Sequence, residues 1–154
     1  MRRHYSEDLR NHYVVSNLSA VVDTNVYVYR AIKDSRYHDE SRDLLDSLSK
    51  WITPTIVVHE VVWTLLELVG RENTLLYIKA LLSHRKVDVI PVTKQDITWS
   101  TMKVLEENLS LTRYNDKIIL SIAKRVKVPI LSFDKKLLSQ ATKIGIAVIN
   151  PYLT

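Results

Sequence analysis

Short apolar segments rich in Val, Ile and Leu alternate along this chain with longer segments whose apolar residues recur at helical spacing. The short runs predict buried strands, and the longer pattern predicts amphipathic helices. Strands that alternate with helices indicate a parallel sheet covered on both faces. We therefore expect an α/β fold, a three-layer α/β/α sandwich with a central, mostly parallel sheet. The expected strands cover residues 18–22, 51–52, 87–92, 129–133 and 146–149, and the expected helices cover 42–48, 54–69, 72–83, 95–109, 116–126 and 135–143.

Capping residues set several of these boundaries. Thr53 is expected to cap a helix that begins at Pro54, because threonine caps helices well and proline suits the first helical position. Gly70 and Gly145 are expected to end the helices before them. Helical spacing and aromatic character also predict core positions, which are Ile97, Met102, Leu105, Ile119, Leu120, Ala123, Trp51, Trp63 and Trp99.

Composition excludes several classes of protein. The chain has 154 residues, only two glycines and no cysteine. Glycine-rich phosphate loops, dinucleotide-binding turns, disulfides and thiolate metal sites are therefore excluded. This length predicts one compact domain, which we divide into an N-terminal extension over 1–16 and a domain over 17–154. No apolar run is long enough to span a membrane, and the N-terminus does not resemble a secretory signal, so we expect a cytoplasmic protein.

The net charge of +5 favours an anionic partner such as nucleic acid. A solvated, mildly basic surface explains the same charge equally well.

Two acids directly follow predicted strands. Asp23 comes after the first strand and Asp134 after the strand over 129–133. The carboxyl ends of parallel strands face the functional crevice of an open sheet, so both acids are candidate ligands by position. Helix capping is the competing interpretation, and for Asp134 alone it is favoured. For Asp23, the following Thr24 and Asn25 are expected to supply the cap and leave its carboxylate free.

Two further acids lie within predicted helices. Glu60 shares one helical stripe with Thr64 and Glu67 on an otherwise apolar helix, so it is expected at an edge between the core and an opening. Asp116 begins a helix, where the N-terminus stabilises negative charge. A solvated stripe and a first-turn preference explain each acid singly. Gathered together, four carboxylates would repel one another, and a hard divalent cation such as Mg²⁺ or Mn²⁺ would remove the conflict.

The segments around these four acids resemble the motifs of PIN domains. AVVDTNVYVY is similar to the first motif and TPTIVVHEVVWTL to the second. TRYNDKIILSIAKR is similar to the third motif, and VPILSFDKKL to the fourth, with serine where threonine is commoner. All four occur in the family's order between residues 18 and 150. The ordered set is more specific than any one motif.

The size and organisation are similar to those of the toxins of VapBC toxin–antitoxin pairs. This resemblance implies a ribonuclease that cleaves single-stranded or structured RNA with Mg²⁺ or Mn²⁺, a VapB-like antitoxin partner and a homodimer. It implies catalytic roles for Asp23, Glu60, Asp116 and Asp134, with metal held by Asp23, Asp116 and Asp134. Hydrogen-bonding support is expected from Thr24, Asn25 and Ser132.

Basic residues near the predicted acids are candidates for RNA binding. They are Arg42, Arg113, Lys117 and Lys135. Two alternatives to a toxin remain open, namely an RNA-processing or decay nuclease without an antitoxin, and a non-catalytic RNA-binding module. Metal-dependent cleavage would separate the binding module from both nucleases.

Overall fold

A single parallel sheet forms the middle of the molecule. The structure, a computed structural model, describes residues 18–152, so the predicted extension over 1–16 lies outside the described residues. The strand order is β3-β2-β1-β4-β5, and every neighbouring pair is parallel. The strands are β1 (Ser19–Val22), β2 (Lys50–Pro54), β3 (Val87–Ile90), β4 (Ile130–Leu131) and β5 (Val148–Ile149).

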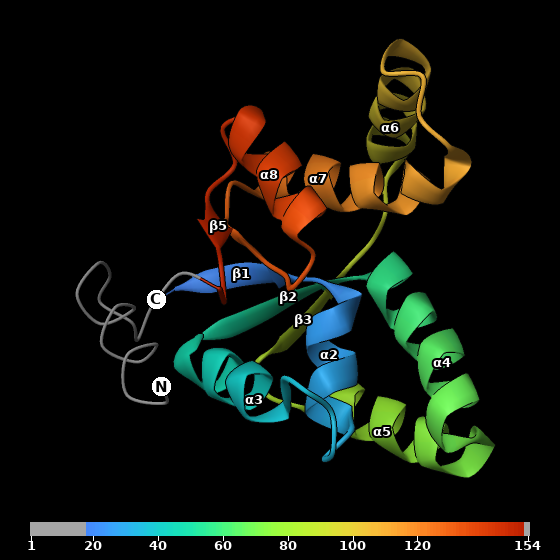
Figure 1. Cartoon of the computed structure of the whole chain (residues 1–154), viewed down its shortest axis with the longest axis vertical. Helices are drawn as coiled ribbons and strands as arrows, with labels where there is room; N and C mark the ends of the chain where they lie inside the picture. The colour runs from blue at the N-terminus through green and yellow to red at the C-terminus, as the bar shows by residue number, and fades with distance from the viewer. Residues whose placement is uncertain (1–17, 153–154) are drawn as a thin grey trace.

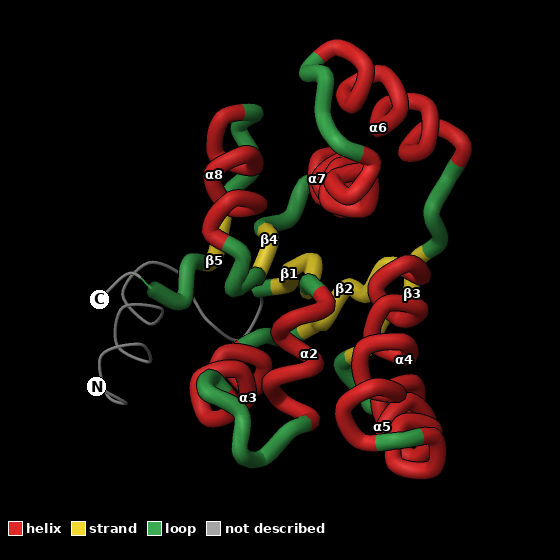
Figure 2. The backbone as a smooth tube through the Cα atoms, turned by 45° about the vertical axis from the view of Figure 1, so that its right-hand side comes forward, coloured by secondary structure: helices red, strands yellow, loops and turns green. Residues whose placement is uncertain are grey.

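Helices cover both faces of this sheet, which confirms the three-layer α/β/α architecture (Figures 1 and 2). Helices α2, α3, α4 and α5 lie on one side, and α7 and α8 lie on the other, with α6 packed outside α7. Among residues 18–152, no helix is long and apolar enough to cross a membrane. The bounds are α2 (Thr24–Ala31), α3 (His38–Ser47), α4 (Thr55–Val69), α5 (Arg71–Ser83), α6 (Lys94–Glu106), η2 (Leu111–Arg113), α7 (Tyr114–Val126) and α8 (Lys135–Lys143).

The central strands form the core. β1 and β4 have no exposed apolar side chain, because helices cover both of their faces. Removing these side chains from water supplies about 25 cal/mol per Å² of apolar surface, the main favourable contribution to folding. On α7, the predicted inner residues Ile119, Leu120 and Ala123 are all buried, which confirms that part of the helical pattern. The parallel pairing of β1 with β4 places the ends of these two strands side by side.

Two predictions at the start of α4 were wrong. Thr53 does not cap this helix, and Pro54 is the last residue of β2, so the helix begins at Thr55. The Thr53 hydroxyl is instead hydrogen-bonded to the Trp51 carbonyl and to the Tyr27 hydroxyl inside the core. The predicted end at Gly70 is confirmed, since this residue has a φ of 81°, a conformation that glycine adopts without strain.

The predicted core face of α6 was also wrong. Ile97, Met102 and Leu105 are exposed, and Asp96 and Ser100 are buried instead. Asp96 faces inward because its carboxylate accepts hydrogen bonds from Ser121 and Arg125 of α7. The apolar side chains predicted to face the core therefore face solvent.

Two further burial predictions were wrong, one for a tryptophan and one for a strand. Trp63 is exposed, whereas Trp51 lies in the core as expected and Trp99 is partly buried against it. The strand β3 is at one edge of the sheet, so its Asp88 and Val89 face solvent rather than being buried.

Candidate active site

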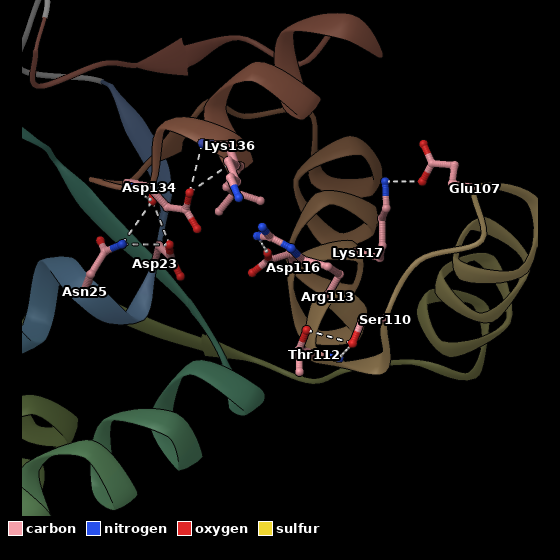
Figure 3. Close-up of polar contacts among 12 residues, drawn as sticks. Asp23, Asn25, Glu107, Ser110, Thr112, Arg113, Asp116, Lys117, Asp134 and Lys136 are labelled. Carbon is pink, nitrogen blue, oxygen red and sulfur yellow. Dashed lines mark hydrogen bonds and ion pairs between the residues drawn. The ribbon is translucent and has the colours of Figure 1, made fainter.

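The pairing of β1 with β4 sets the centre of the site. Val22 is opposite Leu131 in this parallel pair, and the Asp23 backbone N–H donates to the Leu131 carbonyl at 3.0 Å. The first residues beyond both strands, Asp23 and Ser132, therefore lie next to each other. Asp134 follows on the same loop, and Figure 3 shows it beside Asp23 and Asn25.

Asp23 is the most buried acid of the site, with 7% of its surface exposed. Burial, opposed by hydrogen bonds and reinforced by the charges of Glu60 and Asp116, raises its pKa from 3.8 to about 6. Its Oδ1 accepts from the Thr24 backbone N–H at 2.7 Å, so Asp23 itself caps α2. The expectation that Thr24 and Asn25 would supply this cap was wrong.

Ser132 and Asn25 fix the other carboxylate oxygen of Asp23. Ser132 is fully buried, and its hydroxyl donates to Asp23 Oδ2 at 2.7 Å. The same Oγ accepts from the Asp134 backbone N–H, which leaves its single proton for Asp23. Asn25 Oδ1 accepts from the Phe133 N–H, and this turns Asn25 Nδ2 toward Asp23 Oδ2 at 3.2 Å. Each donor therefore has one determined orientation.

Glu60 reaches the site from α4, at the edge position that the sequence predicted. It is partly buried, and its Oε1 accepts from the Thr24 hydroxyl at 3.2 Å. Desolvation and the charge of Asp116 raise its pKa, and hydrogen bonds from Thr24 and Asn115 lower it. Asn115 is a site residue that sequence reasoning missed, although its place immediately before Asp116 was a usable signal.

Asp116 lies in the first turn of α7 and points into the same space (Figure 3). Burial and the neighbouring charge of Asp134 raise its pKa, and Arg113 opposes this effect. Arg113 Nη1 is 3.4 Å from Asp116 Oδ2, and both side chains keep some exposure to solvent. Arg113 is thus the predicted RNA-binding residue that the structure brings to the acids.

Asp134 is both a member of the acidic cluster and a helix cap. Its Oδ1 accepts from the Lys136 and Leu137 backbone N–H groups at 2.9 and 3.3 Å, as the capping interpretation predicted. Its charge also acts on Asp116, so capping and membership of the cluster coexist.

Three other predicted RNA-binding residues are directed elsewhere. Arg42 pairs with aspartates of its own helix, α3. Lys117 is buried and points away from Asp116 toward Glu107, with Nζ 2.5 Å from the Glu107 carboxylate (Figure 3). The Lys135 ammonium lies 4.6 Å from the centre of the Tyr152 ring.

The chemistry of these four side chains fits a hard divalent cation, because all of them offer carboxylate oxygens. Their negative charges also lie close enough to act on one another: those of Glu60 and Asp116 act on Asp23, and that of Asp134 acts on Asp116. Within residues 18–152, however, no three His, Asp or Glu side chains are already close enough to hold an ion together.

The fold is similar to those of several solved toxins. Mycobacterium tuberculosis VapC20, described as a toxin that cleaves the sarcin–ricin loop, has a TM-score of 0.73 and 16% identity, covering 86% of this chain and 99% of that one. A toxin–antitoxin complex from Klebsiella pneumoniae has a TM-score of 0.61 and 19% identity, and the match covers 88% of this chain and 99% of that one. VapBC2 of Rickettsia felis, bound to a promoter DNA fragment, has a TM-score of 0.64 and 15% identity, and the match covers 86% of this chain and 98% of that one.

No curated protein matches the sequence significantly. The model of the PIN domain family matches residues 20–143, a span that includes all four acids. This protein therefore belongs to the PIN domain family.

Proposed function

We propose that this protein is a metal-dependent endoribonuclease that cleaves single-stranded or structured RNA and acts as the toxin of a toxin–antitoxin pair. One observation carries the proposal, namely the gathering of Asp23, Glu60, Asp116 and Asp134 at the carboxyl edge of the sheet. Burial and mutual repulsion raise the pKa values of Asp23, Glu60 and Asp116. A shared cation relieves this repulsion.

The proposed ligands of Mg²⁺ or Mn²⁺ are Asp23, Asp116 and Asp134, with Glu60 completing the cluster directly or through water. All of their donor atoms are carboxylate oxygens, which suit these ions. When bound, such an ion lowers the pKa of a coordinated water and neutralises charge on a phosphodiester.

The chain's own residues hold the ligands in place. Ser132 and Asn25 donate to one oxygen of Asp23, and Thr24 donates to Glu60, so neither carboxylate turns freely. Asp23, whose pKa is about 6, carries a proton part of the time near that pH, and a bound cation would favour its charged form. Arg113, which faces Asp116 at the partly exposed side of the cluster, is placed to bind the incoming phosphate.

The proposed partners follow from the toxin role. Solved proteins of similar fold include a toxin–antitoxin complex, which supports a VapB-like antitoxin for this chain. A homodimer and a cytoplasmic location belong to the same proposal.

The alternative within the same chemistry is an RNA-processing or decay nuclease without an antitoxin. Co-purification of an antitoxin encoded beside this chain would separate the two. A non-catalytic RNA-binding module is the weaker alternative, because it gives no reason to retain four carboxylates that repel one another.

Cleavage of fluorescently labelled RNA, single-stranded and hairpin, tests the proposal. Wild type should cleave with Mg²⁺ or Mn²⁺ and stop on addition of EDTA, and Asp23→Asn should be inactive. Asp34→Asn, at an exposed aspartate outside the site, should cleave like wild type. Folded wild type that binds RNA but leaves it intact with either metal would favour the binding module.

A further inference from the structure

The chain beyond β5 returns to the loop that carries Asp134. β4 and β5 pair in parallel, so the segments that follow these two strands leave the sheet side by side (Figure 2). The Asn150 side chain accepts from the Tyr152 backbone N–H at 2.9 Å, which bends the segment after β5 into a turn. The Tyr152 hydroxyl then donates to the Phe133 carbonyl at 2.8 Å. Tyr152 lies outside residues 20–143, so the family match gives it no role.

Tyr152 contacts both neighbours of Asp134. Its ring meets the Phe133 ring edge-on, with centres 6.1 Å apart, and the Lys135 ammonium lies 4.6 Å from its centre. Tyr37 stacks on Phe133 and also meets the Tyr152 ring edge-on, with centres 5.7 Å apart. These contacts hold the ring of Tyr152 on several sides, so the position of its hydroxyl is fixed.

The peptide unit between Phe133 and Asp134 connects Tyr152 to the acidic cluster. A peptide unit is planar, so its carbonyl and its N–H point in opposite, fixed directions. The carbonyl accepts from Tyr152, and the N–H donates to Ser132 Oγ at 2.9 Å. The Ser132 hydroxyl in turn donates to Asp23 Oδ2 at 2.7 Å. A continuous chain of hydrogen bonds therefore runs from Tyr152 to Asp23.

Every hydrogen bond in this chain has its donor on the side of Tyr152 and its acceptor on the side of Asp23. Hydrogen bonds aligned in this way polarise one another, so each strengthens the next. The Asp23 carboxylate is the final acceptor and the most buried acid of the site, so it depends strongly on donors that replace water. Loss of the first donor should therefore have an effect at the far end of the chain.

We propose that Tyr152 is a positioning residue of the acidic cluster. Its hydroxyl orients the peptide unit before Asp134 and, through it, the Ser132 hydroxyl that holds Asp23. The catalytic consequence of this role rests on the proposed nuclease function, since it concerns the same four acids. The competing interpretation is that Tyr152 only anchors the end of the chain. A simple anchor would add stability without ordering the Asp134 N–H or changing the activity of the site.

Hydrogen exchange of the Asp134 N–H tests the structural step without metal or RNA. Nuclear magnetic resonance of the full chain in EDTA would compare wild type, Tyr152→Phe and Tyr77→Phe. The control is matched, because the Tyr77 hydroxyl also donates to a backbone carbonyl, that of Tyr27, at 3.1 Å. Relative to the β1 amides, the Asp134 N–H should exchange at least about tenfold faster in Tyr152→Phe and at the wild-type rate in Tyr77→Phe. Equal exchange in wild type and Tyr152→Phe, or equal acceleration in both variants, would overturn the proposal.

Steady-state cleavage of labelled RNA tests the functional step. Tyr152→Phe should lower kcat about fivefold and leave KM for RNA within about twofold, because it disturbs the acidic cluster and not an RNA contact. Tyr77→Phe should keep the wild-type kcat. A raised KM with an unchanged kcat in Tyr152→Phe would contradict a positioning role.

A double variant tests whether the effect passes through Ser132. In Ser132→Ala the chain of hydrogen bonds is already broken, so adding Tyr152→Phe should lower kcat by less than about twofold more. Multiplication of the two single effects would mean that Tyr152 acts by another route, and this result would overturn the proposed chain. If wild type neither cleaves RNA nor binds Mn²⁺, the proposed nuclease function fails, whereas hydrogen exchange still decides whether Tyr152 orders the loop.

Discussion

The junctions β1–α2 and β4–α8 share one local design but place their aspartates in different surroundings. At each junction an aspartate follows a buried strand and caps the next helix. Asp23 is 7% exposed and its pKa is about 6, whereas Asp134 is partly exposed and uses one oxygen to accept two backbone N–H groups. The same capping motif therefore gives a buried acid with a raised pKa at the β1–α2 junction and a partly exposed, stabilising cap at the β4–α8 junction.

The largest expected effect is a difference in RNA cleavage rate between variants of Asp23 and variants of Asp134. Asp23→Asn should lower the RNA cleavage rate at least ~10³-fold, because it removes the most enclosed ligand of the proposed cation. Asp134→Asn should lower it by only about 10–100-fold, since asparagine still caps α8 and the other acids remain. Single-turnover cleavage measures both rates. A larger loss in Asp134→Asn would reverse the proposed ranking.

The next largest effect concerns Ser132, which lies at the β4–α8 junction and donates a hydrogen bond to Asp23. Ser132→Ala should reduce cleavage or Mn²⁺ affinity by about 10–100-fold, because Asp23 Oδ2 loses its 2.7 Å hydrogen bond. Ser132→Thr keeps the hydroxyl and should retain activity within a few-fold. If the alanine and threonine variants behave alike, the hydroxyl has no such role.

Stability without metal should change in the opposite direction from activity. The raised pKa of Asp23 means that its charge costs the folded state about 3 kcal/mol at neutral pH. Asp23→Asn removes the charge, but its amide has only one acceptor oxygen. The variant therefore loses either the hydrogen bond from the Thr24 N–H or those from Ser132 and Asn25, and we expect about 1 kcal/mol of net stabilisation in EDTA at pH 7. Urea unfolding measures this difference, with Asp34→Asn as the exposed control. Destabilisation by Asp23→Asn would contradict the free-energy cost that we attribute to the buried charge of Asp23.

The pH dependence follows from the sign of the same pKa shift. The folded state holds the Asp23 proton up to about pH 6, and the unfolded chain releases it near 3.8. The contribution of Asp23 is therefore fully present below 3.8 and is lost as pH rises toward 6. The raised pKa values of Glu60 and Asp116 act in the same direction. Wild type minus Asp23→Asn should show this fall in EDTA, and a flat difference would contradict it.

The smallest effect concerns the cap at the β4–α8 junction. Asp134→Ala should destabilise the metal-free protein by about 1 kcal/mol, because the Lys136 and Leu137 N–H groups lose their acceptor. Asp134→Asn should stay within a few tenths of a kcal/mol of wild type. Thermal unfolding in EDTA compares the two, and equal stability of the alanine variant would mean that the cap contributes nothing.

The parts of the fold that sequence reasoning predicted share a local cause. The apolar run before Asp23 and the glycine at 70 act within a few residues, so the strand and the helix end follow from the pattern itself. The edge position of Glu60 also followed from helical spacing. The family resemblance supplied the roles proposed for the four acids and the expectation of a metal.

The failures have a cause outside the local pattern. The inward turn of Asp96 depends on Ser121 and Arg125 of another helix, so the spacing of Ile97 and Met102 misidentified the core face of α6. The burial of Lys117 likewise depends on Glu107 of the preceding segment. Linear proximity to Asp116 could not reveal this pairing, because adjacent helical residues point in different directions.

Binding of Mn²⁺ in the absence of RNA tests most directly whether the four acids share one cation. Electron paramagnetic resonance titration of the full chain would compare wild type, Asp23→Asn, Asp116→Asn and the Asp34→Asn control. The account predicts Mn²⁺ binding by wild type and the control, and affinity at least ~100-fold lower in both site variants. Unchanged Mn²⁺ affinity in Asp23→Asn and Asp116→Asn would contradict it.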